Sequence, residues 1–259
     1  MYKIKTYLPT LSTFCYVEEF TNKNYIDINK YIFSNDDEGL SNILTEIVGN
    51  NVKSLYDILF VLIYLRMLSV GGELKLKYSD NTGFTSSLSV TLETFLKRFL
   101  QTNFETLPVF KKDDLVIKFK EPTKLFYKNI IDLLLDIVKD IKINNKISDY
   151  LNLKVETKRS IISRLKEDII QSIKVHIKDN SQYCPLAIIE DKNIFPLNLY
   201  NNTPIKLVKL MFKNNLSNLY LKLYHSVNKL NLTYADYISM TPAEIELLLN
   251  IYKTSNNIK

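Results

Sequence analysis

A run of apolar positions between residues 53 and 69 gives the strongest helical pattern in the first half of the chain. Apolar side chains cover one broad face of such a helix and fill much of the rest: Leu55, Ile58, Leu59, Phe60, Val61, Leu62, Ile63, Tyr64, Leu65 and Met67. A helix that is apolar nearly all round is buried on most of its sides. We therefore predict a central core helix that ends at Gly71 and Gly72, since glycine is favoured just beyond a last helical turn.

After Gly72 the apolar positions recur at every second residue, which is the period of a β-strand. This alternation holds over residues 73–78 and again over 87–90, and the Asp80–Gly83 segment between them consists of turn residues. The pattern predicts a β-hairpin. Two further elements are predicted downstream: a helix over Leu92–Leu100 and a strand over Leu115–Phe119 that is closed by Pro122. Together they indicate one small antiparallel sheet inserted at about residues 72–121.

The flanking segments carry weaker patterns. They predict an extended, partly irregular arm over residues 1–40, helices over about Leu40–Val48, Lys124–Lys142 and Val155–Lys178, and a loop over Asp179–Thr203 with strand-like pieces at Leu186–Ile189 and Asn193–Phe195. The two long helices have apolar residues at three- and four-residue spacings. The short Asn144–Tyr150 connection between them favours an antiparallel helical hairpin.

The C-terminal quarter reads as four helices, which start at Thr203, Leu216, Thr233 and Thr241. Thr241, Pro242 and Glu244 have the spacing of a capping box with proline at the first helical position. In the last helix Leu247 and Ile251 widen the apolar stripe beyond what a single core contact usually needs. Two interpretations remain open: this stripe packs inside the chain, or part of it docks on a neighbouring subunit.

These patterns predict an α+β fold that is mainly α, with a helical domain, one small antiparallel sheet inserted in its first half and a C-terminal helical bundle. We expect a single domain over residues 1–259. Its predicted segments are an N-terminal arm and helix (1–50), the core helix with the hairpin-containing insert (51–121), the helical hairpin (122–180), and a loop with the C-terminal helices (181–259).

The composition excludes several kinds of function. Five glycines in 259 residues cannot supply a dinucleotide fingerprint or a phosphate-binding loop, and no Gly-x-Ser-x-Gly motif occurs. No secretory signal is recognised. The most apolar run, Ile58–Leu65, has eight residues, whereas a membrane span needs about 20. We therefore expect two reduced thiols, Cys15 and Cys184, and no membrane span.

The residues that could carry chemistry are few. Four soft metal ligands are present, namely Cys15, Cys184, His176 and His225, and no two of them have the close spacing of a structural zinc site. Nothing marks Cys184 as an activated nucleophile. The paired carboxylates Glu18–Glu19, Asp36–Glu38 and Asp113–Asp114 read as solvated caps and turns. We therefore predict no catalytic, cofactor-binding or metal-binding residues, and a protein that is not an enzyme.

Two basic clusters raise the alternative of a helical nucleic-acid-binding module. They are Lys158, Arg159, Arg164 and Lys166 on one predicted helix, and Lys206, Lys209 and Lys213 on another. The net charge is only +6, acidic residues interrupt the first cluster, and no recognised reader motif appears. Solvated helix faces are therefore favoured. The 17 tyrosines, several of them in the C-terminal helices, are better suited to protein–protein contacts.

Two stretches of the chain carry the pattern of a known family. The first runs from Leu55 to Gly72 and is followed by the alternating hairpin; the second joins Phe195–Leu197, Tyr220–Leu230 and Tyr237–Glu246. The first resembles the middle, and the second the C-terminal part, of the baseplate hub proteins of T4-like contractile-tailed phages. The likeness covers under half of the chain and lies in apolar spacing and helix capping.

This resemblance implies a non-enzymatic structural or assembly protein of the phage tail baseplate. Its partners would be other tail and baseplate proteins. It would be assembled in the host cytoplasm and would lie in the virion tail. It would need no cofactor. Nucleic acid would not be its partner.

Overall fold

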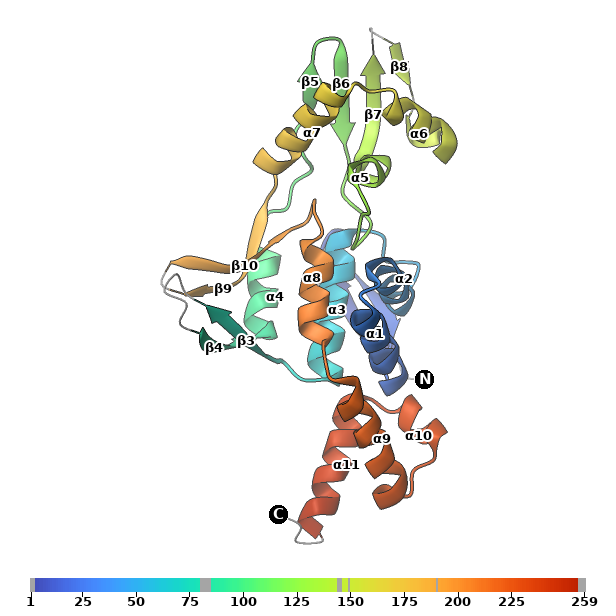
Figure 1. Ribbon diagram of the computed structural model, residues 1–259, viewed down its shortest axis with the longest axis vertical. Helices are drawn as coiled ribbons and strands as arrows, with labels where there is room; N and C mark the ends of the chain where they lie inside the picture. Colours follow the sequence, from blue (N-terminus) through green and yellow to red (C-terminus); the bar gives the residue numbers. More distant parts are fainter. Residues whose placement is uncertain (1–2, 80–84, 144–145, 149, 190, 256–259) are drawn as a thin grey trace. The chain divides into compact units, whose positions relative to one another are not determined.

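The computed structural model describes residues 3–79, 85–143, 146–148, 150–189 and 191–255 (Figure 1). The chain divides into two compact units. Unit 1 comprises Met1–Val52, Asp57–Gln101 and Lys206–Lys259, and unit 2 comprises Lys53–Tyr56 and Thr102–Ile205. Two helices, α3 (Leu55–Ser69) and α8 (Thr203–Phe212), begin with unit 2 residues and continue in unit 1.

Unit 1 begins with a β-hairpin and two helices: β1 (Lys3–Leu8), β2 (Thr13–Glu18), α1 (Asn22–Ser34) and α2 (Asp37–Val48). The hairpin is attached to α3 through Asp57, whose carboxylate accepts hydrogen bonds from the backbone N–H of Thr10, at 3.0 Å, and from its hydroxyl. Asp36 starts α2 by accepting from the backbone N–H of Gly39 at 2.9 Å, which is the usual role of an N-cap carboxylate.

The side chains of α3 form the centre of the apolar core of unit 1. Val61, Leu62 and Ile63 are each 0% exposed. Because consecutive helical residues project about 100° apart, three buried neighbours mean that the helix is covered on most of its circumference. The chain leaves the helix at Gly71, whose φ of 119° favours glycine. The prediction of a central core helix is confirmed.

The second hairpin of unit 1 consists of β3 (Glu73–Ser79) and β4 (Thr85–Thr91), with Leu76 opposite Leu88. Helix α4 (Leu92–Gln101) follows directly and buries Phe95 and Phe99. The predicted hairpin and the helix after it are both confirmed. The predicted turn at Asp80–Gly83 lies outside the described residues.

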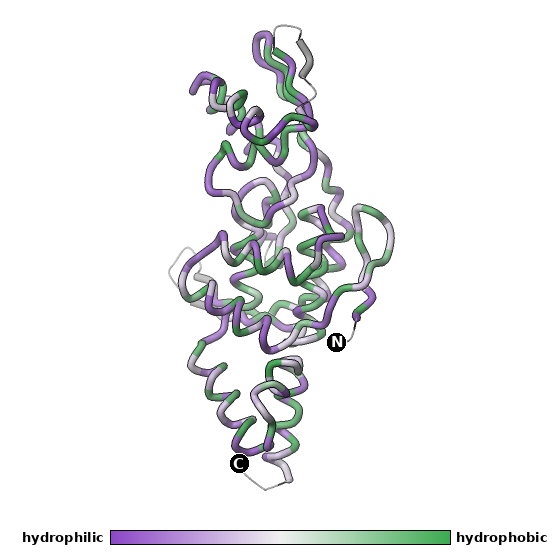
Figure 2. Tube along the Cα trace, turned by 90° about the vertical axis from the view of Figure 1, so that its right-hand side faces the viewer, coloured by the Kyte–Doolittle hydropathy of each residue, from purple (hydrophilic) through white to green (hydrophobic). Residues whose placement is uncertain are grey.

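The C-terminal helices of unit 1 continue from α8 as α9 (Leu216–Leu230), α10 (Tyr234–Ser239) and α11 (Pro242–Ser255). Helices α10 and α11 both pack against α9. Figure 2 shows hydrophobic and hydrophilic residues following one another closely along these helices, as expected where only one side of each helix is covered. All four helices predicted for the C-terminal quarter are present.

Unit 2 is built around an antiparallel sheet in the order β5-β6-β7-β8: β5 (Phe110–Lys112), β6 (Leu115–Phe119), β7 (Val138–Ile143) and β8 (Lys146–Ser148). Ile117 of β6 lies opposite Ile141 of β7, and both are buried. The remaining helices of the unit are α5 (Ile130–Ile137), η1 (Tyr150–Asn152), α6 (Val155–Ser163) and α7 (Glu167–Asp179). A separate two-stranded hairpin is formed by β9 (Tyr183–Ile189) and β10 (Lys192–Asn198).

The prediction of a mainly α fold with one inserted sheet is wrong. The described residues form four antiparallel sheets, of which three have two strands and one has four, and their strands run from β1 to β10. The predicted third strand, β6, does not join the β3–β4 hairpin but pairs with β5 and β7. Strand pairing over long sequence separations depends on partners that local periodicity does not reveal. The fold is therefore mixed α and β.

Three further expectations differ from the structure. The expected arm over residues 1–40 contains the β1–β2 hairpin and α1. In the segment Asp179–Thr203 the two predicted strand-like pieces are confirmed, but they belong to longer strands, β9 and β10, that pair as a hairpin. The helix expected over Lys124–Lys142 ends at Ile137, where Val138 becomes extended with φ −72° and ψ 121°, and the chain continues as β7 instead of forming a helical hairpin. The helix expected over Val155–Lys178 is divided into α6 and α7. The single domain with boundaries at 50, 121 and 180 stays a prediction.

Candidate functional site

Two asparagines of α1 hold the C-terminal helices within unit 1. Nδ2 of Asn22 donates to the backbone oxygens of Tyr237 at 3.2 Å and of Met240 at 2.9 Å, at the end of α10. Two turns later, Nδ2 of Asn29 donates to the backbone oxygen of Phe212 at 3.0 Å, at the end of α8. Both asparagines are buried. The C-terminal helices are therefore attached to unit 1 by buried polar contacts, whose loss is costly.

Beyond these contacts, α9 and α11 expose rows of large apolar side chains. On α9, Tyr220, Tyr224 and Val227 recur at four- and three-residue steps, and on α11 Leu247 and Ile251 are 60% and 52% exposed. These spacings place each set along one side of its helix. Single exposed apolar residues are ordinary, but aligned rows on two helices that pack together are typical of contact surfaces. We call these five residues the C-terminal apolar surface.

The helices that carry this surface are held in place by defined contacts. Lys222 of α9 forms a 2.8 Å salt bridge with Glu246 of α11. Tyr237 of α10 is 1% exposed, and burial raises its pKa to about 12, so its hydroxyl stays protonated. At the start of α11, Glu244 accepts from the backbone N–H of Thr241 at 2.7 Å. These contacts hold the helices that present the apolar rows.

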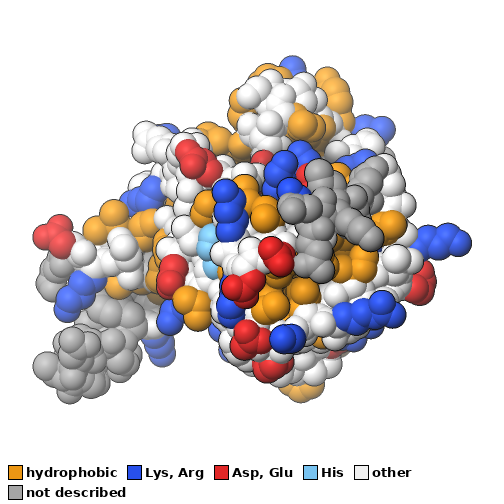
Figure 3. Space-filling view, turned by 90° about the horizontal axis from the view of Figure 1, so that it is seen from above, with side chains coloured by type: hydrophobic (Ala, Val, Ile, Leu, Met, Phe, Trp, Pro, Cys, Tyr) orange, Lys and Arg blue, Asp and Glu red, His pale blue; other side chains and the backbone are white. Residues whose placement is uncertain are grey.

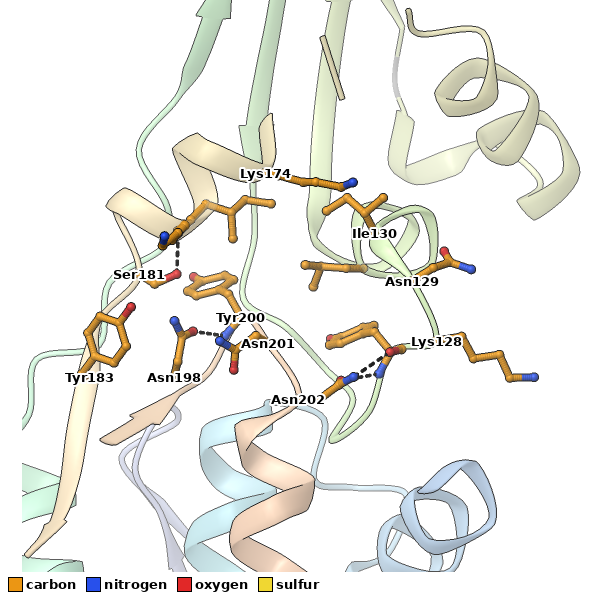
Figure 4. A pocket seen from close by; sticks show the side chains of 14 residues that line it. Lys128, Asn129, Ile130, Lys174, Ser181, Tyr183, Asn198, Tyr200, Asn201 and Asn202 are labelled. Atoms are coloured by element: carbon orange, nitrogen blue, oxygen red, sulfur yellow. Dashed lines mark hydrogen bonds between the residues drawn. The ribbon is translucent and has the colours of Figure 1, made fainter. Parts of the chain in front are cut away.

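Unit 2 contains a pocket of about 430 Å³ (Figure 4), a size typical of ligand sites. Fourteen residues from the start of α5, the end of α7, β9, and the segment from β10 to α8 line it: Tyr127, Lys128, Asn129, Ile130, Leu133, Lys174, Ile177, Lys178, Ser181, Tyr183, Asn198, Tyr200, Asn201 and Asn202. Three of these residues are lysines and none is acidic. We call this the lysine–asparagine pocket.

Internal hydrogen bonds fix much of the pocket wall. Asn202 is fully engaged with the backbone of Tyr127: its Oδ1 accepts from the N–H at 3.0 Å and its Nδ2 donates to the carbonyl at 2.9 Å. The hydroxyl of Tyr127 donates to Asp136 at 2.5 Å. Burial, and next the Asp136 carboxylate, raise the pKa of Tyr127. Burial also raises the pKa of Tyr200 to about 12. Both phenols are therefore protonated at neutral pH.

The soft ligands considered from the sequence are divided between the two units. Cys15, on β2, and His225, on α9, lie in unit 1, whereas Cys184, on β9, and His176, on α7, lie in unit 2. Neither cysteine forms a disulfide within the described residues. Burial, and next the Asp57 carboxylate, raise the pKa of Cys15, which is the opposite of activation.

Within the described part of the chain, no three or more His, Cys, Asp or Glu side chains are grouped so that they could hold a metal ion. His176 instead donates from Nε2 to the carbonyl of Pro108 at 2.9 Å and stacks on Phe119. That the protein needs no metal and no cofactor stays a prediction.

The paired carboxylates have different surroundings. Asp36 caps α2. Asp113 lies in the β5–β6 turn with a φ of 50°. Glu18 and Glu19 line a second pocket, of about 390 Å³, in unit 1. Burial, and next the neighbouring Glu244 carboxylate, raise the pKa of Glu19. Acidic residues thus gather at this pocket, where Asp27 and Glu46 join the Glu18–Glu19 pair that the sequence pointed to.

The basic clusters are divided between the units and partly neutralised. Lys209 of α8 forms a salt bridge with Asp37 and donates to Asn35 at 2.9 Å. In unit 2, Lys158 donates to the carbonyl of Leu151 at 2.8 Å, and Arg159 lies 4.0 Å from Asp132. Basic and acidic side chains are interspersed on the face seen in Figure 3. None of these features favours the nucleic-acid-binding alternative.

Sequence reasoning found part of the C-terminal apolar surface and missed the lysine–asparagine pocket. Leu247 and Ile251 stood out because they widened a helical stripe. The pocket is assembled from three separate segments that together span residues 127 to 202. Its asparagines carry no signal in a chain that is rich in asparagine throughout.

The family described as "T4 bacteriophage base plate protein" matches residues 1–188. Neither the curated proteins nor the solved structures gave a match. Among the described residues, no helix combines the length and the apolar character needed to cross a membrane.

Proposed function

Since the chain belongs to the T4 bacteriophage base plate protein family, we propose that it is a non-enzymatic structural or assembly component of the tail baseplate that acts through contacts with other tail proteins. Family membership implies a place in the virion tail. Assembly in the host cytoplasm, and a role in the hub part of the baseplate, are further elements of the proposal.

The observation that carries the proposal is the C-terminal apolar surface. Its two rows lie on α9 and α11, beyond the residues 1–188 that match the family. A protein that assembles with others must present fixed apolar side chains to them, because burial of apolar area is the main favourable term in association. Leu247 and Ile251 are each more than half exposed, so they contribute little to the interior of the chain. This supports the docking interpretation of the last helix.

A pair of charge substitutions tests the role of this surface. Leu247→Lys combined with Ile251→Lys should leave the protein folded but prevent it from copurifying with the other baseplate proteins of the same phage. The matched control is Gln171→Lys with Val175→Lys, which adds the same charge at the same four-residue spacing on α7, where both residues are exposed. Equal copurification of the two variants would refute the assignment of this surface.

Deletion of residues 241–259 separates the two interpretations of the last helix. If the shortened protein becomes insoluble, the helix is part of the core. If it stays folded and no longer joins the complex, the helix is an interface. Normal folding and assembly of the shortened protein would contradict both.

A further inference from the structure

In the lysine–asparagine pocket, three asparagines use their side-chain oxygens within the protein and leave their side-chain NH2 groups available as donors. Oδ1 of Asn129 accepts from the backbone N–H of Asp132 at 3.0 Å, Oδ1 of Asn198 from that of Tyr200 at 2.8 Å, and Oδ1 of Asn201 from that of Thr203 at 3.1 Å. A backbone N–H can only donate, so these bonds fix which end of each amide is oxygen. In the described part of the chain, the Nδ2 groups of the three asparagines have no hydrogen-bond acceptor. The pocket therefore offers three amide donors: those of Asn198 and Asn201 lie close together, and that of Asn129 lies at the opposite edge and points outward (Figure 4).

The charge at the pocket has a single sign. Lys174 and Lys178 lie four residues apart on α7, so both project from the side of the helix that lines the pocket. Neither forms a salt bridge within the part of the chain that the structure describes. The carboxylate of Asp136 is engaged by the hydroxyl of Tyr127, at 2.5 Å, and by Thr123, at 2.6 and 2.7 Å. A ligand that accepts hydrogen bonds and carries negative charge suits these groups.

The remaining wall is apolar and aromatic. Ile130, Leu133 and Ile177 line the pocket beside the tyrosines. A bare anion would leave these side chains uncovered, whereas an aspartate or glutamate side chain brings a short apolar stem with its carboxylate. Unspecific binding of single-stranded nucleic acid relies on aromatic faces that are open to stacking. Of the three tyrosines in the lining, Tyr127 and Tyr200 are only 5% and 2% exposed, so their faces are closed to bases, whereas Tyr183 is 48% exposed. One open ring does not make the row of stacking platforms that successive bases need.

We propose that the lysine–asparagine pocket binds an acidic segment of a protein partner, with one or two Asp or Glu carboxylates held by Lys174, Lys178 and the amides of Asn129, Asn198 and Asn201. The proposal rests on the proposed function only in taking the partner to be another baseplate protein. The binding chemistry belongs to the pocket alone. The pocket would bind its partner through electrostatic contacts, whereas the C-terminal apolar surface would bind through apolar contacts.

The test is a titration of the full-length, ¹⁵N-labelled protein, followed through its side-chain amide signals by NMR. The probe is the capped peptide acetyl-Ser-Glu-Ala-Glu-Ser-amide, and its comparison is the same peptide with glutamine in place of glutamate. The side-chain amide signals of Asn129, Asn198 and Asn201 should shift with the glutamate peptide, and saturation should need about tenfold or more of the glutamine peptide. Equal behaviour of the two peptides, or no shift, overturns the proposal.

Two further probes distinguish other sources of negative charge. Inorganic phosphate should shift the same amide signals more weakly than the peptide does, since it covers none of the apolar wall. A six-nucleotide oligothymidylate should bind no better than the glutamine peptide. Tighter binding of the oligonucleotide than of the glutamate peptide would reassign the pocket to nucleic acid and overturn the proposal.

Charge-matched variants locate the binding. Lys174→Gln combined with Lys178→Gln should lower the affinity for the glutamate peptide about tenfold or more. Lys111→Gln with Lys118→Gln removes the same charge from exposed positions on β5 and β6 of unit 2 and should change binding less than about twofold. Equal losses in both variants would mean unspecific attraction and overturn the proposal. Because the titration uses the isolated protein, its failure is independent of whether the α11 variants lose their baseplate partners.

Discussion

Asn29 of α1 donates a 3.0 Å hydrogen bond from Nδ2 to the backbone oxygen of Phe212, the last residue of α8. The same Nδ2 donates to the backbone oxygen of Tyr25 at 2.9 Å, and Oδ1 accepts from the backbone N–H of Asn214 at 2.7 Å. The Asn29 side chain is 1% exposed, and both its Nδ2 and its Oδ1 form hydrogen bonds, mainly to the backbone that connects α8 to α9. Asn22 donates from its Nδ2 to the backbone oxygens of Tyr237 and Met240 and so holds the end of α10.

Asn29→Ala should lower the free energy of unfolding by about 1–3 kcal/mol, because backbone groups at Phe212 and Asn214 lose their buried partner. Urea unfolding measures the change. Amide hydrogen exchange should show the largest loss of protection in α9. The control is Asn50→Ala, at an exposed position in the turn after α2, which should change stability by less than about 0.5 kcal/mol. Similar losses in both variants would contradict this role for Asn29.

Two leucines of α3 provide a matched test of the core. Leu62 is 0% exposed, whereas Leu68 on the same helix is 49% exposed. Leu62→Ala should lower the free energy of unfolding by about 2–5 kcal/mol, since it removes buried methyl groups and leaves a cavity. Leu68→Ala should have a much smaller effect. Chemical denaturation measures both, and a Leu68→Ala cost as large as that of Leu62→Ala would mean that the helix is not the centre of the core.

The elements that sequence reasoning predicted correctly have local causes. The apolar residues of α3 leave no polar side to face water, and Thr241 with Glu244 forms the start of α11 through bonds within one helical turn. The β3–β4 hairpin shows strict alternation. Such signals need no knowledge of distant residues.

The elements that sequence reasoning missed depend on contacts with residues far away in the sequence. Ile137 and Ile141 are spaced as in a helix, yet Ile141 belongs to β7 because it pairs with Ile117, which lies 24 positions earlier. Helix α1 has a weak apolar pattern because two of its buried positions are Asn22 and Asn29, whose partners lie beyond residue 210. The lysine–asparagine pocket is likewise made by tertiary contacts between segments that each look like ordinary loops and helix ends.

Glu19 gives the protein a pH-dependent contribution to stability. Burial and the Glu244 carboxylate raise its pKa in the folded state. The ionised form is therefore disfavoured by folding: the penalty is fully present well above both pKa values and disappears as the pH falls through the raised, folded value. Glu19→Gln should raise the free energy of unfolding at pH 7, by less than about 1 kcal/mol at this partly exposed site.

The advantage of Glu19→Gln should shrink as the pH is lowered, which thermal unfolding at a series of pH values can follow. The control is Glu156→Gln, an exposed glutamate of α6. A stabilisation by Glu19→Gln that grows toward acid pH would contradict the sign of the raised pKa.

The last helix depends on its first residue. The hydroxyl of Thr241 accepts from the backbone N–H of Glu244 at 3.2 Å, while the Glu244 carboxylate accepts from the backbone N–H of Thr241 at 2.7 Å and from its hydroxyl at 3.0 Å. Each partner thus satisfies a donor at the helix start that would otherwise be unpaired. The buried anchor Ile245 follows within the first turn, so loss of the cap should loosen the attachment of α11 to α9.

Thr241→Ala should therefore cost about 1 kcal/mol of stability and raise amide exchange across α11 more than in α3. The matched control is Thr254→Ala in the last turn of the same helix, where the hydroxyl bonds only to the carbonyl of Asn250, at 2.9 Å, and the side chain is exposed. Because Leu247 and Ile251 lie between these two threonines, the capping variant should also weaken copurification with baseplate proteins, and the control should not. Full binding by a protein whose α11 exchanges freely would show that the apolar row of this helix is not the contact.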